Sequence, residues 1–390
     1  MTRSAETGSA NASVDSRSAK ALSERSSLAV LGWDVGGANI KVARIEVYSG
    51  GPCPPVTLRG DPFAPLRVDG RCPPTVIEHA FPMWREFNRL PSVLVELADR
   101  VGRAPTMAVT MTAELADCFA TKRDGVRFVV AAFETAFPGS TIRVYGVDGR
   151  FRSVDEARGQ PHDVAAANWR ASATLVARAI PDALFLDVGS TTADIIPIVG
   201  GRVTAEGCTD TVRLRSGELV YTGCLRTPVC AIVRWAPVHG EKCGVAAEHF
   251  AVAADVYRWL GQIDDASYTC ETPDGRGRSR EEAGARLARM VCADLETLGE
   301  HDLTALARHV ANAQSQQIAE GIREVLQRLG AAQPRVAVVA GSGSFMARAA
   351  AESVGLVARD PVGDFGADAW RSAPAVAVAY LLAELVIGDW

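Results

Sequence analysis

One short pattern occurs twice in this chain and constrains its fold more than any other feature. Residues 34–37 (DVGG) and 187–190 (DVGS) each follow one apolar run and precede another. Apolar runs on both sides of a Gly-rich tip predict two β-hairpins, each with an acidic residue near the end of its first strand. One copy alone would be ordinary hairpin chemistry. Two copies favour a duplicated fold that holds a phosphate group in a cleft between its halves.

The remaining segments predict an α/β protein with mixed sheets. Hairpin strands are expected at 27–31, 40–47, 184–187 and 195–199, with a turn at 200–203 into further strand, and other strands at 107–111, 141–146 and 336–340. Amphipathic segments predict helices at 82–97, 123–136, 163–179, 247–262, 278–298, 303–329, 345–353 and 373–387. The 390 residues suffice for two lobes with a sizeable core, and no linker separates them.

The expected division of the chain follows from these segments. Residues 1–27, rich in Ser and Ala, are expected to be a disordered extension. Residues 28–180 are expected to form a first lobe, and 181–390 a second lobe with a helical insertion and a C-terminal helix. The Gly- and Pro-rich segment 49–75 is expected to be an irregular connection or short strands.

Charge and composition limit the partners. A net charge of −5 gives no general electrostatic support to a nucleic-acid or anionic-membrane partner. No run of about 18 apolar residues predicts a membrane span, and the N-terminus lacks the apolar core of a signal peptide. We therefore expect a cytoplasmic protein that acts on small molecules, and the oligomeric state stays open.

The nine cysteines favour free thiols over a disulfide framework, because their number is odd and no CxxC pair occurs. Four of them lie between residues 208 and 243. Their spacing is wider than the ligand spacing of a structural zinc site, so scattered core or loop thiols are favoured over zinc. The six histidines show no metal-ligand spacing and receive no role.

The two Gly-rich turns have the chemistry of an anion site. Backbone N–H groups converge at such tips, and Gly36 and Gly37 let a phosphate approach the backbone closely. Carboxylates repel phosphate, but Asp34 and Asp187 can hold Mg²⁺, which neutralises it. A third loop, 341–343 (GSG), follows a buried strand and opens a helix, where anions are favoured, although it is neither a full GxGxxG nor a Walker motif. The expected phosphate-binding residues are Gly36, Gly37, Asn39, Lys41, Gly189, Ser190, Thr191, Thr192, Gly341, Ser342 and Gly343.

These three stretches, in this order, resemble the phosphate-1, phosphate-2 and adenosine motifs of the actin, sugar kinase and Hsp70 superfamily, and the turns resemble its hydantoinase/oxoprolinase branch. Further segments are similar to the tetrahydromethanopterin-linked C1-transfer proteins and their archaeal relatives, the methanofuran-biosynthesis synthases. Those segments are 112–119 (TAELADCF), 121–126 (TKRDGV), 166–169 (AANW), 209–213 (TDTVR), 217–223 (GELVYTG) and 274–276 (DGR). The resemblance covers about residues 30–390. It implies a duplicated actin-like, ribonuclease H-like fold, with two lobes around a central cleft.

The resemblance also implies an unusual reaction for this fold. The diphosphate ester of an aminomethyl-furan-methanol would react with the phenol of a tyramine or tyrosine derivative, forming an aryl ether and releasing diphosphate. The phosphate loops and Mg²⁺ would then stabilise a leaving group. A phenol has a pKa of about 10 and needs a base. Glu114 and Asp117 are the candidates, with Lys122 to lower the phenol pKa or to hold an acidic substituent. The alternative for all three is a helix N-terminus followed by a solvated charged run.

Two further residues are candidates for substrate binding. Arg213 suits a diphosphate or a carboxylate, although a plain surface arginine fits the pattern as well. Asn168, beside Trp169, could close the pocket over an aromatic ring, whereas Trp169 itself fits core packing better. The DGR segment at 274–276 is a turn first and a substrate loop second.

Two other functions stay open on the sequence. The chain could be an ATP-dependent kinase or phosphatase of the same fold that acts on a small molecule. It could also be a non-catalytic nucleotide-binding module, although such a module has no need for the acid-rich segment 112–126.

Overall fold

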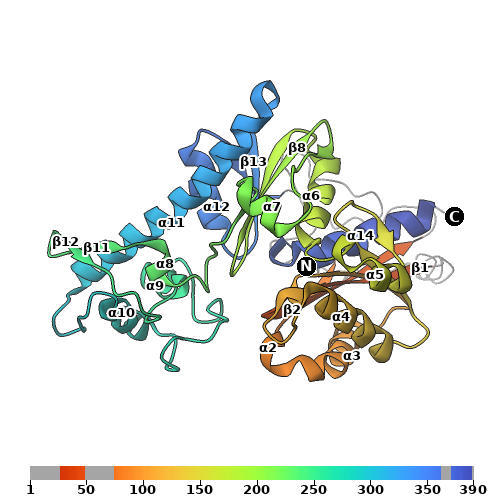
Figure 1. The fold of residues 1–390 in the computed structure, drawn as a ribbon, viewed down its shortest axis with the longest axis horizontal. Helices are drawn as coiled ribbons and strands as arrows, with labels where there is room; N and C mark the ends of the chain where they lie inside the picture. Colours follow the sequence, from red (N-terminus) through yellow and green to blue (C-terminus); the bar gives the residue numbers. More distant parts are fainter. Residues whose placement is uncertain (1–26, 49–73, 362–369, 389–390) are drawn as a thin grey trace, which may run out of the picture.

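The computed structural model describes residues 27–48, 74–361 and 370–388. Its first sheet, whose strands β1 and β2 are labelled in Figure 1, has the strand order β3-β2-β1-β4-β5-β6. The strands are β1 (Ser27–Val35), β2 (Asn39–Tyr48), β3 (Thr75–Ala80), β4 (Thr106–Met111), β5 (Thr141–Tyr145) and β6 (Phe151–Arg152). β1 and β2 form the first expected hairpin, and β4 and β5 continue the sheet in parallel with β1.

The second sheet repeats this arrangement, with the order β10-β8-β7-β13-β14 and β9 also paired to β8. The strands are β7 (Ala183–Val188), β8 (Ala193–Val199), β9 (Arg202–Val203), β10 (Leu219–Val220), β13 (Val336–Ala340) and β14 (Val357–Arg359). β7 pairs antiparallel with β8 and parallel with β13, as β1 does with β2 and β4. The repeated topology confirms the expected duplicated actin-like α/β fold.

The helices of the first lobe cover one face of its sheet. They are α2 (Met83–Glu86), η1 (Phe87–Arg89), α3 (Leu90–Val101), η2 (Ala113–Leu115), α4 (Lys122–Ala136), α5 (Val154–Gly159) and η3 (Pro161–Asp163). The helix expected over 82–97 is therefore interrupted by η1. The Thr121 hydroxyl caps α4 by accepting from the backbone N–H of Asp124. Between sheet and helices, the rings of Trp33 and Phe133 meet edge to face, with 5.6 Å between their centroids, inside the hydrophobic core of this lobe.

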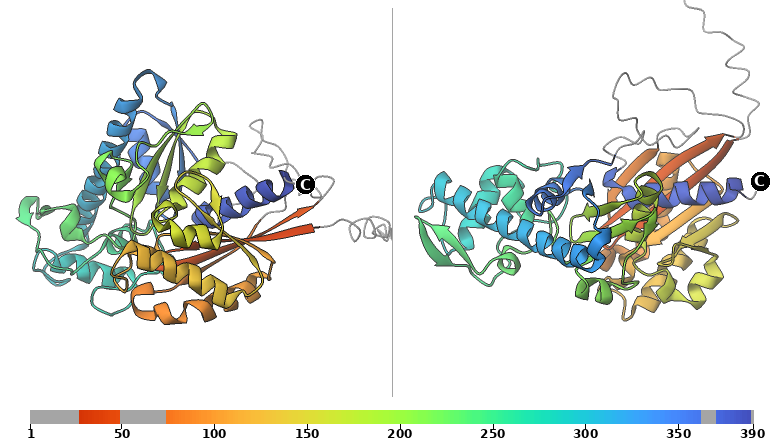
Figure 2. Two further views of the ribbon diagram at one scale, coloured as in Figure 1. Left: turned by 45° about the vertical axis from the view of Figure 1, so that its right-hand side comes forward. Right: turned by 90° about the horizontal axis from the view of Figure 1, so that it is seen from above.

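Two helices, α6 (Asn168–Ala179) and α14 (Ala373–Gly388), form a shared layer between the sheets (Figure 2). α14 packs on β1, β2 and β4 of the first sheet, and α6 packs on β7 and β8 of the second and on α14. The approach of α14 is close, because a Cβ on Gly32 would overlap the backbone oxygen of Ala375. The packing of both helices crosses the division expected at residue 180, which places α6 in the first lobe and α14 in the second.

The start expected for α6 was wrong. The helix begins at Asn168 and not at residue 163, because Pro161–Asp163 form η3 and Ala166 has a φ of 51°. A positive φ at a non-Gly residue interrupts a right-handed helix.

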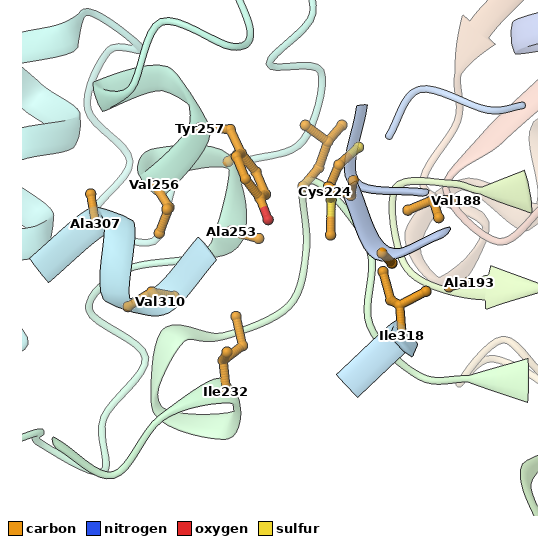
Figure 3. Packing of buried hydrophobic residues seen from close by; sticks show 14 of the residues in the cluster. Val188, Ala193, Cys224, Ile232, Ala253, Val256, Tyr257, Ala307, Val310 and Ile318 are labelled. Carbon is orange, nitrogen blue, oxygen red and sulfur yellow. The ribbon is translucent and has the colours of Figure 1, made fainter. Parts of the chain in front are cut away.

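A mainly helical subdomain is inserted between β10 and β13. Its elements are α8 (Val229–Ile232), β11 (Trp235–Val238), β12 (Glu241–Gly244), α9 (Ala253–Trp259), α10 (Arg280–Arg289), α11 (Glu300–Leu329) and η4 (Gly330–Ala332). α7 (Asp210–Arg215) precedes it, and α12 (Ser344–Ser353) follows β13. The helices expected over 247–262 and 278–298 are much shorter, and the β11–β12 hairpin was not predicted. One apolar core joins this subdomain to the second sheet, with Val188, Cys224 and Ile318 on the sheet side and Tyr257 on the helical side (Figure 3).

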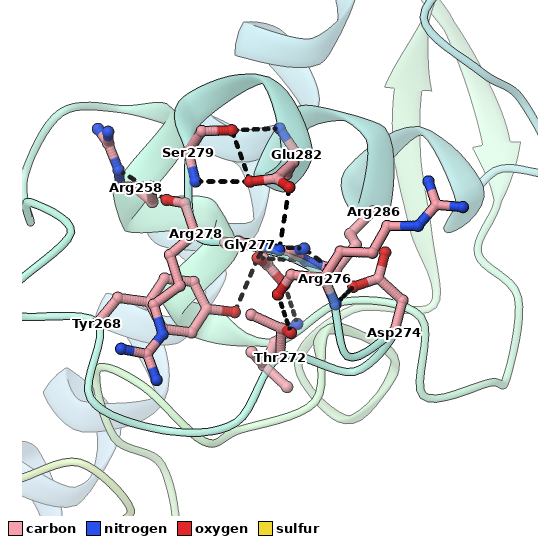
Figure 4. A network of polar contacts seen from close by, with 12 residues as sticks. Arg258, Tyr268, Thr272, Asp274, Arg276, Gly277, Arg278, Ser279, Glu282 and Arg286 are labelled. Carbon is pink, nitrogen blue, oxygen red and sulfur yellow. Dashed lines mark hydrogen bonds and ion pairs between the residues drawn. The ribbon is translucent and has the colours of Figure 1, made fainter.

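A buried ion-pair network fixes the irregular loop between α9 and α10 (Figure 4). The fully buried Arg286 pairs with Asp255 at 2.8 Å and with Asp274 at 3.1 Å, and the Tyr268 hydroxyl donates to Asp255 at 2.9 Å. Asp274 also pairs with Arg289. Asp274, the acid of the DGR segment, therefore anchors this loop. Both of its ion pairs are with arginines of α10, inside the subdomain, which fits a structural turn.

Several expectations fall partly outside the described residues. The disordered extension expected over 1–27 lies outside them except for Ser27, which belongs to β1, where the first hairpin strand was expected to start. The connection expected over 49–75 also lies outside them up to residue 73, and its last residue, Thr75, starts β3. No helix in the described ranges is long and apolar enough to cross a membrane.

Candidate active site

The two hairpin tips have the same backbone geometry. The N–H of Gly36 donates to the Asn39 carbonyl at 2.9 Å, and the N–H of Gly189 donates to the Thr192 carbonyl, also at 2.9 Å. Across the hairpins, Asp34 faces Lys41, whereas Asp187 faces a second acid, Asp194. The repeat in the sequence is therefore a repeat in structure, and it carries three carboxylates.

Asp34, Asp187 and Asp194 form an acidic cluster, because the charge of Asp194 acts on both other carboxylates and the charge of Asp34 acts on Asp187. Burial raises the pKa of Asp34 to about 6, an effect that Lys41 opposes and Asp194 reinforces. Burial raises the pKa of Asp187 to about 7, and the charges of Asp194 and Asp34 add to the rise. Gathering such acids without full neutralisation costs free energy, which is typical of a functional site.

The cluster fits a hard divalent cation. Oδ1 of Asp34 is buried without a hydrogen-bond partner, so that a lone pair is left for a ligand. No three His, Cys, Asp or Glu side chains in the described part of the chain are arranged around a single ion. Mg²⁺ in phosphate-handling sites is usually held by one or two carboxylates together with phosphate oxygens and waters, and Asp34 and Asp187 suit that arrangement.

The third predicted loop lies against the second hairpin. The N–H of Gly343 donates to the Val188 carbonyl at 2.7 Å. Gly341 has a φ of 85°, and a Cβ there would overlap both Asp187 Oδ1 and the Val188 carbonyl. Ser342 Oγ lies 3.2 Å from the thiol of Cys224. The structure therefore brings the loop 341–343 to Asp187, as the order of motifs indicates.

The second tip is also fixed by residues 223–226, which contact the loop 341–343 through Cys224. The N–H of Cys224 donates to the Gly189 carbonyl at 3.0 Å, and the N–H groups of Leu225 and Arg226 both donate to the Ser190 carbonyl. A Cβ on Gly223 would overlap the backbone at Ser190 and Thr191. Together these contacts hold the tip rigidly, which a preorganised anion site requires.

Glu114 is the predicted base candidate with the more unusual surroundings. Its side chain is 1% exposed, and its Oε2 atom is buried without a partner. Burial raises its pKa to about 7, although the charge of Lys122 lowers it, and the charges of Asp210 and Asp34 raise it. α4 packs tightly on it, because a Cβ on Gly125 would overlap the Glu114 backbone. Asp117, in contrast, is exposed.

The other predicted site residues have protein partners. Lys122 Nζ lies 2.9 Å from Asp210 Oδ2, at the start of α7. Arg213 is 1% exposed, donates to Asp194 at 2.5 Å and lies over the Trp169 ring at 4.3 Å. Arg213 is therefore not the surface arginine of the alternative interpretation. The Asn168 side-chain oxygen accepts from the backbone N–H of Trp169, whose ring is in the core, as expected.

A cavity of about 330 Å³ opens where the two tips meet the helical subdomain. It is lined by residues from both lobes and from the subdomain, namely Ala38, Asn39, Ala80, Pro82, Trp84, Ser190, Leu225, Arg226, His249, Val252, Thr269, Cys270 and Glu271. Another cavity, of about 430 Å³, lies beside α4 and β5 and contains none of the predicted site residues. The cleft cavity is therefore the candidate substrate pocket.

The two-lobed fold and the acidic cluster between Gly-rich tips define a member of the actin-like superfamily. The chain belongs to the hydantoinase/oxoprolinase family, whose model matches residues 105–385. It is 35% identical over 355 residues to the (4-{4-[2-(gamma-L-glutamylamino)ethyl]phenoxymethyl}furan-2-yl)methanamine synthase of Methanocaldococcus jannaschii, covering 90% of this chain and 97% of that one. It is 32% identical over 147 residues to the synthase of the same name from Methanococcus vannielii, covering 38% of this chain and 66% of that one. The resemblance inferred from the motifs is thereby confirmed, and the expectation of an enzyme agrees with the names of both relatives.

Solved structures match more loosely. Nucleotide-free acetone carboxylase matches with a TM-score of 0.49 at 11% identity, over 91% of this chain and 70% of that one. ParM of Bacillus thuringiensis with ATP matches with a TM-score of 0.36 at 10% identity, over 93% of this chain and 100% of that one. The strand order of the two sheets, and not these likenesses, defines the fold.

Some residues at the site were not predicted. Asp194 could have been found by counting across the hairpin, since it faces Asp187 in the strand register. Asp210 lies in a segment used for the resemblance, but its partner Lys122 is 88 positions away. Trp84 and Arg226 meet across the cleft, and neither has a local sequence signal.

Proposed function

We propose that this protein joins the diphosphate ester of an aminomethyl-furan-methanol to the phenol oxygen of a tyramine or tyrosine derivative, releasing diphosphate. The reaction would serve the biosynthesis of a methanofuran-type C1 carrier. The observation that carries the proposal is the 35% identity to the Methanocaldococcus jannaschii synthase over 97% of its length. The name of that relative contains a phenoxymethyl group on a furan that bears a methanamine, which is the type of linkage that this reaction forms.

The site supports the departure of diphosphate. We propose that the N–H groups and hydroxyls at the two tips hold its oxygens, and that Asp34 and Asp187 hold Mg²⁺. The cation supplies neutralisation of the charge that gathers on the leaving oxygens. Arg213, donating to Asp194, keeps that carboxylate oriented beside the other two. In this proposal the two hairpin tips stabilise the departing diphosphate, whereas in a kinase they would position a phosphate for transfer.

Glu114 is the proposed general base. It takes the proton from the phenol as the phenol oxygen bonds to the furfuryl carbon and the bond from that carbon to diphosphate breaks. A carboxyl group whose pKa is raised to about 7 is partly ionised at neutral pH and basic enough to assist a phenol. The burial of Glu114 and its unpartnered oxygen favour it over the exposed Asp117. Lys122, paired with Asp210, is proposed to act on Glu114 through its charge.

A cytoplasmic location belongs to the same proposal. The seven cysteines in the described part of the chain, from Cys118 to Cys292, are all free. Free thiols are typical of a reducing compartment, which supports the location.

The test uses purified protein with the furan diphosphate, a tyramine or tyrosine derivative and Mg²⁺, without ATP. The expected result is the aryl ether, identified by mass spectrometry, with one diphosphate released per ether formed. Release of diphosphate without any ether would contradict the proposal. Rapid turnover of ATP with a small-molecule acceptor would instead support the kinase alternative.

A further inference from the structure

Arg226 is a cation of the cleft cavity that has no carboxylate partner among the residues that the structure describes. The guanidinium of this half-buried residue lies 5.1 Å from the centre of the Trp84 ring, which belongs to the opposite lobe. Arg85, which follows Trp84 in the chain, has a carboxylate partner by comparison, because its guanidinium nitrogen lies 2.6 Å from Glu271 Oε1. An arginine kept in a cleft without a counter-ion retains its hydrogen-bonding capacity for an incoming anion.

The backbone of Arg226 is tied to the second phosphate-binding tip. Its N–H donates to the Ser190 carbonyl at 2.9 Å, and Ser190 and Asn39, one residue from each tip, line the same cavity. On the other side, the Leu225 carbonyl accepts from the N–H of Ala254, at the start of α9. The guanidinium is therefore carried by a segment fixed both to the tip and to the helical subdomain.

The electrostatics of the cleft are asymmetric. Asp34, Asp187 and Asp194 lie in the hairpin strands, on one side of the cleft. Arg226 lies on the cavity side, where its positive charge lowers the pKa of the Cys270 thiol, although burial raises that pKa more strongly. A diphosphate between the tips would have the metal-binding acids on one side and a free guanidinium on the other. Lys41 is less available for this role, because its Nζ already donates to the Arg371 carbonyl at 3.0 Å.

We propose that Arg226 binds the diphosphate group of the substrate, with Trp84 holding the guanidinium at the cavity wall through a cation–π contact. The proposal rests on the proposed function in naming a diphosphate ester, but it can be tested with inorganic diphosphate alone. Arg226 was not among the residues that the sequence indicated, since Trp84 and Arg226 are distant in the chain and meet only in the folded structure.

The experiment is a calorimetric titration of the full chain with inorganic diphosphate in the presence of Mg²⁺. Arg226→Ala is expected to weaken binding about tenfold or more, because a charge-assisted, bidentate contact is lost. Arg226→Lys keeps the positive charge but loses the two parallel N–H donors of the guanidinium, so its affinity for diphosphate is expected to lie between those of the wild type and Arg226→Ala. Unchanged affinity in Arg226→Ala would overturn the proposal.

The matched control is Arg280→Ala. Arg280 lies over Trp259 at 3.9 Å in the same subdomain, but neither residue lines the cleft cavity. An equal loss of diphosphate affinity in this control would show a general charge effect and would count against the site. Thermal unfolding of each variant checks the fold, and Trp84→Leu, expected to weaken binding more mildly, tests the site if Arg226→Ala does not fold.

A carboxylate on the phenolic substrate is the competing anion for Arg226. A second titration therefore compares a phenolic amine with the same compound bearing a glutamyl carboxylate. If Arg226→Ala loses the preference for the carboxylate but keeps its diphosphate affinity, the proposal is wrong. If the protein binds diphosphate through Arg226 but forms no ether, the proposed function fails while this site stands.

Discussion

Lys122 Nζ lies 2.9 Å from Asp210 Oδ2 and thereby ties the start of α4 in the first lobe to the start of α7 in the second. Both partners are about a quarter exposed, so that the pair is partly screened by solvent. Asp210 also lies 3.7 Å from Arg213, which in turn holds Asp194. A chain of alternating charges thus runs from the segment that carries Glu114 to the acidic cluster.

Breaking this pair is expected to affect catalysis more than stability. Lys122→Met and Asp210→Asn should each change the free energy of unfolding by no more than about 1 kcal/mol, as is usual for a partly exposed pair. Each should lower kcat/KM several-fold, because the lobes lose a contact beside Glu114. A double-mutant cycle measures the coupling. If the effects of the two substitutions on kcat/KM simply add, the two residues do not act as a unit.

Glu114→Gln is expected to abolish the pH dependence attributed to the base. In the wild-type protein, kcat/KM should rise through about pH 7 as the carboxyl group loses its proton. The variant should be slower by ~10²–10⁴-fold, without that rise, since an amide cannot accept the proton. Asp117→Asn removes an exposed acid from the same segment and should keep the wild-type pH profile. Unchanged turnover in both variants would exclude both candidates.

Asp34 and Asp187 should be required for turnover, although burying their ionised carboxyl groups lowers the free energy of unfolding. Asp34→Ala and Asp187→Ala are each expected to abolish activity through lost binding of metal and diphosphate. Full activity in either variant would refute that assignment.

The stability effect depends on pH. The pKa of Asp34 rises from 3.8 to about 6 in the folded state, because burial disfavours the ionised form. The penalty is absent below about pH 4, grows between the unfolded and folded pKa values and is complete above about pH 6. In metal-free protein, Asp34→Asn should therefore gain on the order of 2 kcal/mol over the wild type at pH 8 relative to pH 4. Chemical denaturation at the two pH values measures this gain, and an equal effect of the substitution at both pH values would contradict it.

Gly341→Ala tests the contact between the third loop and Asp187. Gly341 and Gly355 have nearly equal positive φ values, 85° and 83°, so that alanine is strained at both positions. A Cβ at Gly341 would also overlap Asp187 Oδ1, whereas at Gly355 no atom lies within 4 Å. Both variants should lose about 1–2 kcal/mol through φ, and only Gly341→Ala should lose more stability and its diphosphate affinity. Equal losses in both would show that the overlap does not matter.

The local parts of this structure were predictable from the sequence, and the long-range parts were not. The two hairpins were recognisable because an apolar run, an acid and a Gly-rich tip are contiguous in the chain. β13 was placed at its observed bounds, since five apolar residues ahead of a GSG loop are a local signal. The repeat of these local units also predicted that the two tips and the loop 341–343 lie together, whereas the roles assigned to their residues stay predictions.

Contacts between distant residues had no such signal. The burial of Glu114 depends on the packing of α4, and the partnership of Arg213 with Asp194 depends on the placing of α7 beside β8. The sequence indicated Arg213 as a candidate for substrate binding, but not that its guanidinium would be buried against a carboxylate and an indole. Trp84 and Arg226 are distant in the chain and meet only in the folded structure.

The position of α14 has a consequence for the synthesis of the protein. β1, β2 and β4 are made early, but the helix that covers one face of their sheet is the last described element to leave the ribosome. At ~5–20 residues per second, that face waits on the order of tens of seconds for its cover. During this interval the nascent first lobe exposes an apolar surface around Val30 and Ala43. We expect chaperones that bind exposed apolar surface to bind it.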